Sequence, residues 1–249
     1  KETITYHNQS PDALSYLWLQ LDQNQQAESS DSYTTQTGSI DTRVTAGQLA
    51  RMERSGSLDR GDHIEKVTDA KGTPLSYTIN KTMMRVDLPQ PLASGASYVF
   101  KIDWWYNIND RSKEGGRSGY EYFPKDSSYL YTIAQFFPRM CVYDDINGWQ
   151  NKQFLGSGEF TLVFGDYDVN ITVPADHAIA ATGVLQNPKD VLTKAQQERY
   201  AQAQKSYTEP VKIITNEEAL KNESGRAKAE KTWHFKATNV RDFAFASSR

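Results

Sequence analysis

Hydrophobic and polar residues alternate in short runs along most of the chain, a pattern typical of strands with one buried face. The longest run covers residues 98–107, and its apolar face should pack against a core. That face consists of Tyr98, Phe100, Ile102, Trp104 and Tyr106. Residues 14–21 similarly gather three leucines on one face. Other strands are predicted at residues 2–7, 64–68, 76–80, 83–88, 177–182, 183–185, 210–214 and 232–237.

Other patterns predict turns, loops and helices. Residues 159–164 and 167–173 are predicted to form a hairpin with Gly165 and Asp166 at the turn, and residues 22–38 a long polar surface loop. Thr193 and Gln196 have the spacing of a capping box, which predicts a surface helix running to about residue 205. Residues 48–54 and 217–221 favour shorter helical turns. We therefore expect a mainly β fold of antiparallel sheets, sandwich-like or strongly twisted, with one peripheral helix.

The most informative stretch is residues 129–150, where two strand-like runs, 129–134 and 140–143, flank the segment Gln135-Phe136-Phe137-Pro138-Arg139. Pro138 fixes its own φ and favours an extended conformation for the residue before it. Turn-forming residues follow at 144–148, where Gly148 can adopt a positive φ. Gln135 thus presents an amide at a stiff corner, and a buried structural role and a functional role are both open for it.

Composition excludes some classes of function. The 249 residues allow one large β domain or two smaller ones, and the net charge of −3 with scattered lysine and arginine argues against a nucleic-acid-binding protein. No apolar run approaches the roughly 20 residues of a membrane span. The single cysteine, Cys141, should be a buried, inert thiol. Both chain ends lie in strand-like sequence, so we expect a fragment of a longer polypeptide.

Complete catalytic or metal-binding motifs are missing from the sequence. The four histidines, at positions 7, 63, 177 and 234, lack zinc-site spacing. Asp166, Asp168 and Asn170 begin like a calcium loop, but isoleucine stands where that loop needs glycine. Asp144 and Asp145 are adjacent and would point to opposite faces of a strand. The residues alone therefore leave three readings: a binding domain, part of a larger enzyme, or a structural module.

Residues 131–153 read Y-T-I-A-Q-F-F-P-R-M-C-V-Y-D-D-I-N-G-W-Q-N-K-Q. This sequence resembles a bacterial branch of the gluzincin aminopeptidases, relatives of aminopeptidase N and leukotriene hydrolase. The similarity extends to residues 2–23, 158–183 and 240–249 in the same order. In that family a saddle-shaped β domain precedes a thermolysin-like catalytic domain, which carries G-A-M-E-N-like and H-E-x-x-H motifs. Neither motif occurs here.

The resemblance implies that residues 1–249 are the amino-terminal β domain of a zinc aminopeptidase, without its first strands and without the catalytic domain that follows. No catalytic or metal-binding residue is then expected in the chain, and the parent enzyme would hold the zinc. The implied partners are the catalytic domain of the same polypeptide and a peptide substrate. Export to the periplasm or the medium is expected from the relatives, with the cytoplasm as the other option. A free-standing peptide- or glycan-binding β-sandwich is the alternative function.

The family's first domain also contributes an acidic or amide residue that binds the substrate's α-amine, within a Q-x-E or Q-x-Q pattern before an arginine. The matching place here reads Gln135-Phe136-Phe137, so Gln135 is the remaining candidate. Tyr120 and Tyr122 are candidates to line the same cleft, with a core role equally open. Arg139 is expected to pair with Asp144 or Asp145 rather than to touch substrate.

Overall fold

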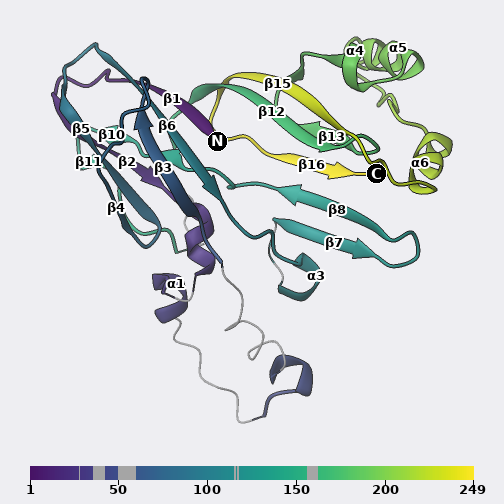
Figure 1. Ribbon diagram of the computed structural model, residues 1–249, viewed down its shortest axis with the longest axis horizontal. Helices are drawn as coiled ribbons and strands as arrows, with labels where there is room; N and C mark the ends of the chain where they lie inside the picture. The colour runs from purple at the N-terminus through teal and green to yellow at the C-terminus, as the bar shows by residue number, and fades with distance from the viewer. Residues whose placement is uncertain (28, 36–42, 50–59, 115, 117, 156–161) are drawn as a thin grey trace. The chain divides into compact units, whose positions relative to one another are not determined.

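The computed structural model describes residues 1–27, 29–35, 43–49, 60–114, 116, 118–155 and 162–249 (Figure 1). The fold is mainly β, as the sequence predicts, and its paired strands are antiparallel. The chain divides into two compact units. The first unit comprises Lys1–Ile108 and Gln135–Val163, and the second comprises Asn109–Ala134 and Phe164–Arg249.

The first unit contains two larger sheets and a small hairpin. One sheet has the order β1 (Glu2–His7), β6 (Ser97–Trp105), β3 (His63–Asp69). The other has the order β4 (Tyr77–Asn80), β5 (Met83–Leu92), β2 (Leu14–Gln20), β9 (Arg139–Met140). The hairpin joins β10 (Tyr143–Asp144) to β11 (Gly148–Trp149), and its Gly148 has φ +68°, as a tight turn requires. Two short helices follow β2, namely η1 (Asp22–Gln26) and α1 (Asp31–Thr34).

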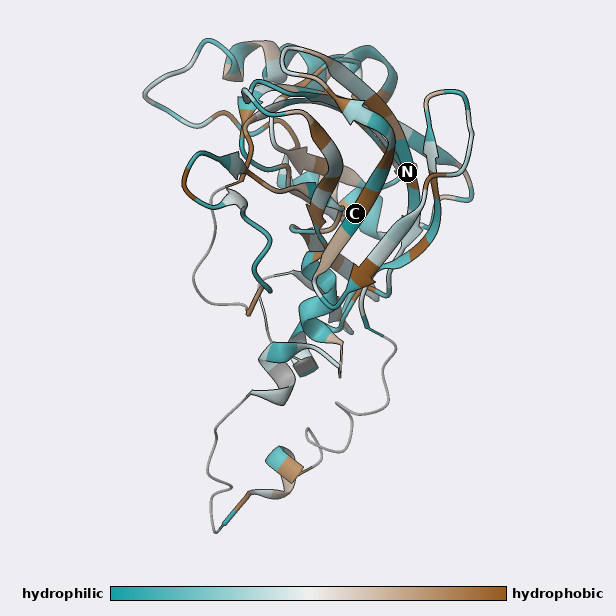
Figure 2. Ribbon diagram, turned by 90° about the vertical axis from the view of Figure 1, so that its left-hand side faces the viewer, coloured by the Kyte–Doolittle hydropathy of each residue, from teal (hydrophilic) through white to brown (hydrophobic). Residues whose placement is uncertain are grey.

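The core of the first unit is built from the faces that the alternation identifies. Phe100 and Ile102 of β6 are fully buried, and Tyr98 and Trp104 pack against the same cluster. Leu17 and Leu19 of β2, with Leu21 just after it, are fully buried too. Figure 2 shows hydrophobic and hydrophilic positions alternating along the strands. Because successive side chains of a strand point to opposite faces, this alternation is enough to place one face in the core.

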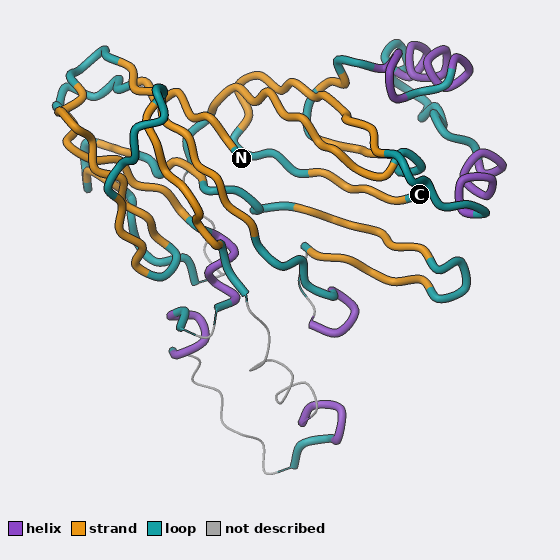
Figure 3. Tube along the Cα trace, in the orientation of Figure 1, coloured by secondary structure: helices purple, strands orange, loops and turns teal. Residues whose placement is uncertain are grey.

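The second unit contains two sheets and most of the helices (Figure 3). One sheet has the order β13 (Ala178–Ala181), β16 (Phe245–Ser248), β8 (Ser128–Ile133), β7 (Gly119–Phe123). The other has the order β12 (Gly165–Pro174), β15 (Glu230–Val240), β14 (Val184–Leu185). The helices of this unit are α3 (Arg111–Glu114), α4 (Pro188–Val191), α5 (Lys194–Ala203) and α6 (Asn216–Glu223).

The predicted capping box is confirmed at the start of α5. The backbone of Gln196 donates to the Thr193 hydroxyl (3.3 Å), and the Thr193 backbone donates to Oε1 of Gln196 (3.0 Å). Two of the first orphan N–H groups of the helix are satisfied in this way. The predicted turn at 217–221 lies within α6, which has a second capping box, formed by Thr215 and Glu218.

Two predicted elements differ from the structure, and a third lies largely outside the described residues. Gly165 and Asp166 do not form a hairpin turn, because they belong to β12, which pairs with the distant β15. Residues 156–161, the greater part of the expected partner strand, lie outside the described residues. Residues 210–214 form no strand, since no neighbouring strand pairs with them within the described part of the chain. The helical turn at 48–54 lies largely outside the described residues.

Gly183 joins β13 to β14, and an alanine there should be costly. Its φ is +90°, and an added Cβ would collide with the carbonyl oxygen of Lys236 in β15. Gly72 is a matched control, because it has the same φ of +90° and open space around it. Both alanine variants impose the left-handed backbone cost, of about 1–2 kcal/mol. Gly183→Ala should lower the free energy of unfolding by roughly a further 1–3 kcal/mol in urea titrations. Equal losses in the two variants would contradict this packing.

Candidate functional site

Gln135 is the first residue of the first unit after the chain leaves β8. Its φ is +53°, a conformation that is uncommon for a residue other than glycine. Its side-chain amide makes no hydrogen bond in the described part of the chain, and neither amide atom is buried without a partner. The amide is therefore accessible to solvent at a residue whose backbone is held in a strained conformation.

The backbone of this corner is held by two side chains of the first unit. Nε2 of Gln23 donates to the carbonyl oxygen of Gln135 (2.6 Å), and the indole N–H of Trp104 donates to the carbonyl oxygen of Phe136 (3.1 Å). Phe137, at the second polar position of the family pattern, is only 9% exposed and belongs to the core. These contacts make the corner stiff while leaving the Gln135 amide unused.

Arg139 closes the corner through a buried ion pair with Asp22. Its Nε donates to Oδ2 of Asp22 (2.7 Å) and its Nη2 to Oδ1 (2.6 Å), with side-chain exposures of 5% and 1%. Nε2 of Gln20 also donates to Oδ1 of Asp22 (2.6 Å). The expected pairing of Arg139 with Asp144 or Asp145 is wrong. The prediction of an exposed loop from residue 22 onward is also wrong at Asp22, because an arginine in the interior needs a carboxylate beside it.

Asp144 instead organises the hairpin turn. Its Oδ1 accepts from the backbones of Ile146 (3.0 Å) and Asn147 (2.8 Å), and its Oδ2 accepts from Nε2 of Gln150 (2.5 Å). The backbone of Asn147 and the amide of Gln150 lower the pKa of Asp144, because donors stabilise the charged form. The Y-D-D-x-N-G-W part of the similar stretch is therefore used for turn structure.

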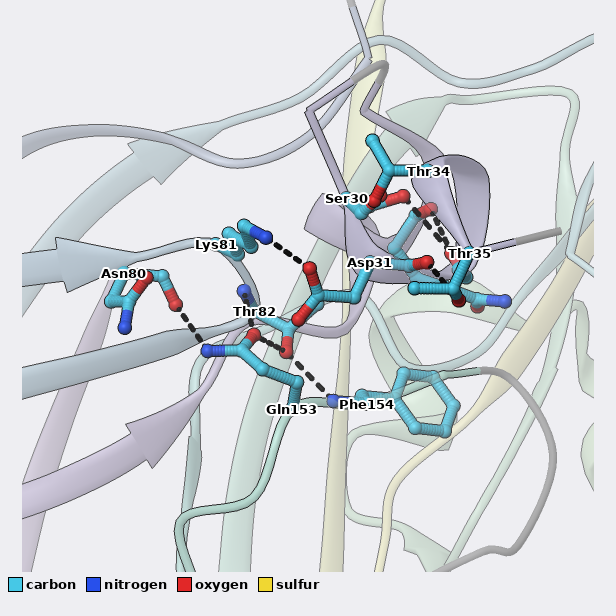
Figure 4. Close-up of polar contacts among 11 residues, drawn as sticks. Ser30, Asp31, Thr34, Thr35, Asn80, Lys81, Thr82, Gln153 and Phe154 are labelled. Atoms are coloured by element: carbon cyan, nitrogen blue, oxygen red, sulfur yellow. Dashed lines mark hydrogen bonds and ion pairs between the residues drawn. The ribbon is translucent and has the colours of Figure 1, made fainter.

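Gln153, at the end of that stretch, also has a structural role (Figure 4). Its Oε1 accepts from the backbone (2.9 Å) and the hydroxyl (2.6 Å) of Thr82, and its Nε2 donates to the carbonyl oxygen of Asn80 (2.9 Å). The same Thr82 hydroxyl accepts from the backbone of Phe154 (2.8 Å). This network ties the segment after β11 to the turn between β4 and β5, beside the ion pair of Lys81 with Asp31.

Tyr120 and Tyr122 lie in β7 of the second unit, whereas Gln135 belongs to the first. The register places Tyr120 opposite Tyr131 and Tyr122 opposite Tyr129, so the four rings share one face of the sheet. The ring centroids of Tyr122 and Tyr129 are 4.8 Å apart, and these two side chains are 44% and 41% exposed. We call these four residues the tyrosine array. Its outer half is an exposed stacking surface rather than core.

The ionisable side chains of the described residues form no metal site. No group of three or more His, Cys, Asp or Glu residues is arranged there to hold a metal ion. Asp168 instead binds Nε2 of His234 (2.6 Å) and Nζ of Lys236 (3.0 Å) on the surface of the sheet. Burial raises the pKa of Cys141 to about 12, which keeps its thiol protonated and unreactive. No described helix combines the length and the apolar character that crossing a membrane would require.

Sequence reasoning missed Asp22, Gln23 and Trp104 as the residues that fix the corner. The polar run D-Q-N-Q-Q directly after an apolar strand was the available signal. A surface loop explains such a polar run equally well. The fold shows that residues of this run bind Gln135 and Arg139, which lie more than a hundred positions away in the sequence.

No family model and no curated protein matches the chain. Among solved structures, an M1 zinc metallopeptidase from Deinococcus radiodurans aligns with 98% of this chain and 36% of its own, with 13% identity and a TM-score of 0.43. A mutant of that protein bound to a Tyr-Ser-Ala substrate aligns over the same shares, with 12% identity and a TM-score of 0.44. The chain thus spans about a third of these structures, and similarity at this level does not by itself assign a function.

Proposed function

We propose that this chain is the non-catalytic amino-terminal domain of a zinc-dependent aminopeptidase and forms part of the cleft that holds the amino terminus of a peptide substrate. The motif similarity of residues 131–153 to the gluzincin aminopeptidases supports this proposal. Its partners are then the catalytic domain of the same polypeptide and the peptide substrate, and export from the cytoplasm belongs to the same proposal.

The observation that carries the proposal is the state of Gln135. A structural glutamine uses its amide in hydrogen bonds, because an unpaired buried amide is costly. Gln135 instead has an unused, accessible amide on a rigid backbone with φ +53°. Its Oε1 is suited to accept a hydrogen bond from an ammonium group. Because the amide of Gln135 lacks the charge of a carboxylate, it would orient the substrate's ammonium group more than attract that group.

The chemistry of hydrolysis belongs to the part of the enzyme that would carry H-E-x-x-H. No group of His, Cys, Asp or Glu in the described residues is arranged to hold a metal ion, so we assign no zinc ligand and no catalytic step to this chain. When bound in the parent enzyme, zinc would supply an activated water for attack on the peptide bond. The contribution of this chain is to position the substrate.

Replacing Gln135 in the intact enzyme tests its role. A hydrogen bond to a charged group contributes about 1.5–3 kcal/mol, so Gln135→Gly should raise KM by roughly 10- to 100-fold with little change in kcat. Glycine accepts a positive φ, so this variant removes the amide without adding strain. Steady-state hydrolysis of aminoacyl-anilides gives both constants.

Two further variants sharpen that test. Gln135→Glu adds a carboxylate and should lower KM, since a charge-assisted hydrogen bond is stronger. Gln186→Ala is the control, because the side chain of this exposed glutamine of the second unit donates to the carbonyl oxygen of the nearby Val184. If Gln135→Gly behaves like Gln186→Ala in both constants, Gln135 has no role in substrate binding.

The tyrosine array favours the alternative, a free-standing module that binds peptides or glycans. Exposed tyrosine rings offer apolar faces for stacking against sugar rings or side chains. Titration of the chain with oligosaccharides and peptides, followed by tyrosine fluorescence, separates the two functions. Binding that Tyr122→Ala abolishes, together with a gene that encodes no H-E-x-x-H sequence, would favour the module over the peptidase domain.

A further inference from the structure

Two carboxylates of the first unit are buried beside the sheet β1-β6-β3. Glu2 pairs directly with Ile102 of β6, so the two side chains share a face, and that face is the buried one. On the other side of β6, Ile64 pairs with Trp104, two residues along from Ile102. Asp62 stands two residues before Ile64, just ahead of β3, and both of its carboxylate oxygens are buried. Both acids thus point toward the interior from opposite sides of β6.

Neither acid has the hydrogen bonds that an ionised carboxylate needs. Both side-chain oxygens of Asp62 and Oε1 of Glu2 are buried, and no hydrogen-bond partner for them is found among the described residues. The backbone N–H of Asp62 donates to Oδ1 of Asn24 (2.6 Å), which holds the segment in place and brings no donor to the carboxylate. A buried carboxylate without donors is strongly disfavoured in its charged form, so the group keeps a proton instead.

The surrounding groups do not reverse this preference. Asp22 acts on Asp62 with like charge, and Asp62 acts likewise on Glu2 and on the Tyr106 phenol. The α-amine of Lys1 favours an ionised Glu2, but burial has the larger effect. The positive charge of Arg139 is engaged by Asp22. Two basic residues are close to Asp62 in the sequence: Arg60 lies two positions before it and His63 directly after it. The His63 ring is stacked on Trp105, with 3.9 Å between the ring centroids. Burial, with the charge of Asp22, raises the pKa of Asp62 to about 7, and burial raises that of Glu2 well above its usual value.

We propose that Glu2 and Asp62 form a buried proton-binding pair that makes the first unit sensitive to pH near neutrality. Both carboxyls are protonated in the folded chain under mildly acidic conditions, and Asp62 loses its proton as the pH rises through about 7. The new charge has no donor and repels Asp22, so it weakens the attachment of the start of β3 to η1. Asn24 accepts the hydrogen bond from the backbone of Asp62, and the preceding residue, Gln23, donates to the carbonyl oxygen of Gln135. The contact that holds Asp62 and the contact that holds Gln135 are therefore made by adjacent residues of η1.

The sign of the pH dependence follows from the raised pKa. Below about pH 4 both the folded and the unfolded chain carry the proton on Asp62, and the side chain has no effect on the pH dependence. Between about pH 4 and pH 7 only the folded chain keeps the proton on Asp62, so the free energy of unfolding falls as the pH rises. Above about pH 7 Asp62 is ionised in both the folded and the unfolded chain, and the free energy of unfolding stays at its lowered value.

Urea unfolding of the chain and of Asp62→Asn between pH 4 and pH 8 tests the pair. The ratio of the unfolding constant of the wild type to that of Asp62→Asn should rise on the order of a thousandfold over this range. Asp103→Asn is the control, since Asp103 is a surface carboxylate whose pKa is lowered by Lys1. A ratio that stays constant, as for a carboxylate exposed in both states, would overturn the proposal.

A second measurement keeps the proposal testable if Asp62→Asn does not fold. Carbon-13 NMR of the side-chain carboxyls in the wild-type chain should show one aspartate titrating near pH 7. Where Asp62→Asn does fold, that signal should vanish and the titration of Glu2 should move to lower pH, because a neighbouring negative charge has been removed. Titration of every aspartate below about pH 5 would refute the pair.

Discussion

Replacing Asp22 with alanine should lower the free energy of unfolding of the first unit by about 3–5 kcal/mol, the cost of removing one partner of a buried ion pair. The side chain of Arg139 is 5% exposed in the native chain, and in this variant it would lose both of its hydrogen bonds to Asp22. The corner that carries Gln135 would lose its anchor at the same time. Urea unfolding at pH 7, followed by tryptophan fluorescence, measures the loss.

Two comparisons separate the lost charge pair from lost packing. Asp87→Ala breaks the exposed pair of Arg85 with Asp87 and should change stability far less, since surface ion pairs contribute little. The double variant Asp22→Leu with Arg139→Met should recover most of the loss, because apolar groups of similar volume can replace a buried pair. If Asp22→Ala costs no more than Asp87→Ala, the buried pair does not hold the corner.

Replacing Phe100 with alanine should cost about 3–5 kcal/mol, the range found for large-to-small substitutions in well-packed cores. Phe100 is fully buried in the middle of β6, between β1 and β3 in the sheet, so neighbours on both sides limit how far the cavity can collapse. Ile146→Ala is the control, because that side chain is 84% exposed in the hairpin turn. The same urea titration compares the two variants, and a similar, small loss in both would show that β6 does not carry the core.

The core and the strands of the first unit were largely predictable because their signal is local. In residues 98–107 the apolar side chains recur at every second position, and the structure buries that face around Phe100 and Ile102. The capping box of Thr193 and Gln196 was equally readable, since its donors and acceptors lie within one helical turn.

Strand partners and ion pairs were not predictable, because they depend on residues far apart in the sequence. Arg139 was expected to pair with nearby Asp144 or Asp145, whereas its partner Asp22 lies 117 positions away. In the same way, β12 was assigned to a local hairpin although it pairs with β15, where Ile171 faces Trp233. Alternation specifies which face of a strand is buried but not which strand lies beside it.

The candidate site follows the same division. The stiffness of the proline-containing corner was predictable from adjacent residues, and the family resemblance made Gln135 a candidate whose role stays a prediction. The sequence did not reveal the positive φ of Gln135 or the contact from Gln23, because both depend on the path of the chain through the fold. The acids Glu2 and Asp62 gave no signal either, since each looks like an ordinary polar residue beside a strand.

The central claim is that this chain is the substrate-positioning domain of a zinc aminopeptidase. Its most direct test is to express the complete gene and to measure bound zinc and aminoacyl-anilide hydrolysis beside the isolated chain. The account predicts about one zinc per polypeptide and hydrolysis for the complete protein, with neither zinc nor activity for residues 1–249 alone. A complete protein without zinc and without hydrolysis, or an isolated chain that holds stoichiometric zinc, would contradict it.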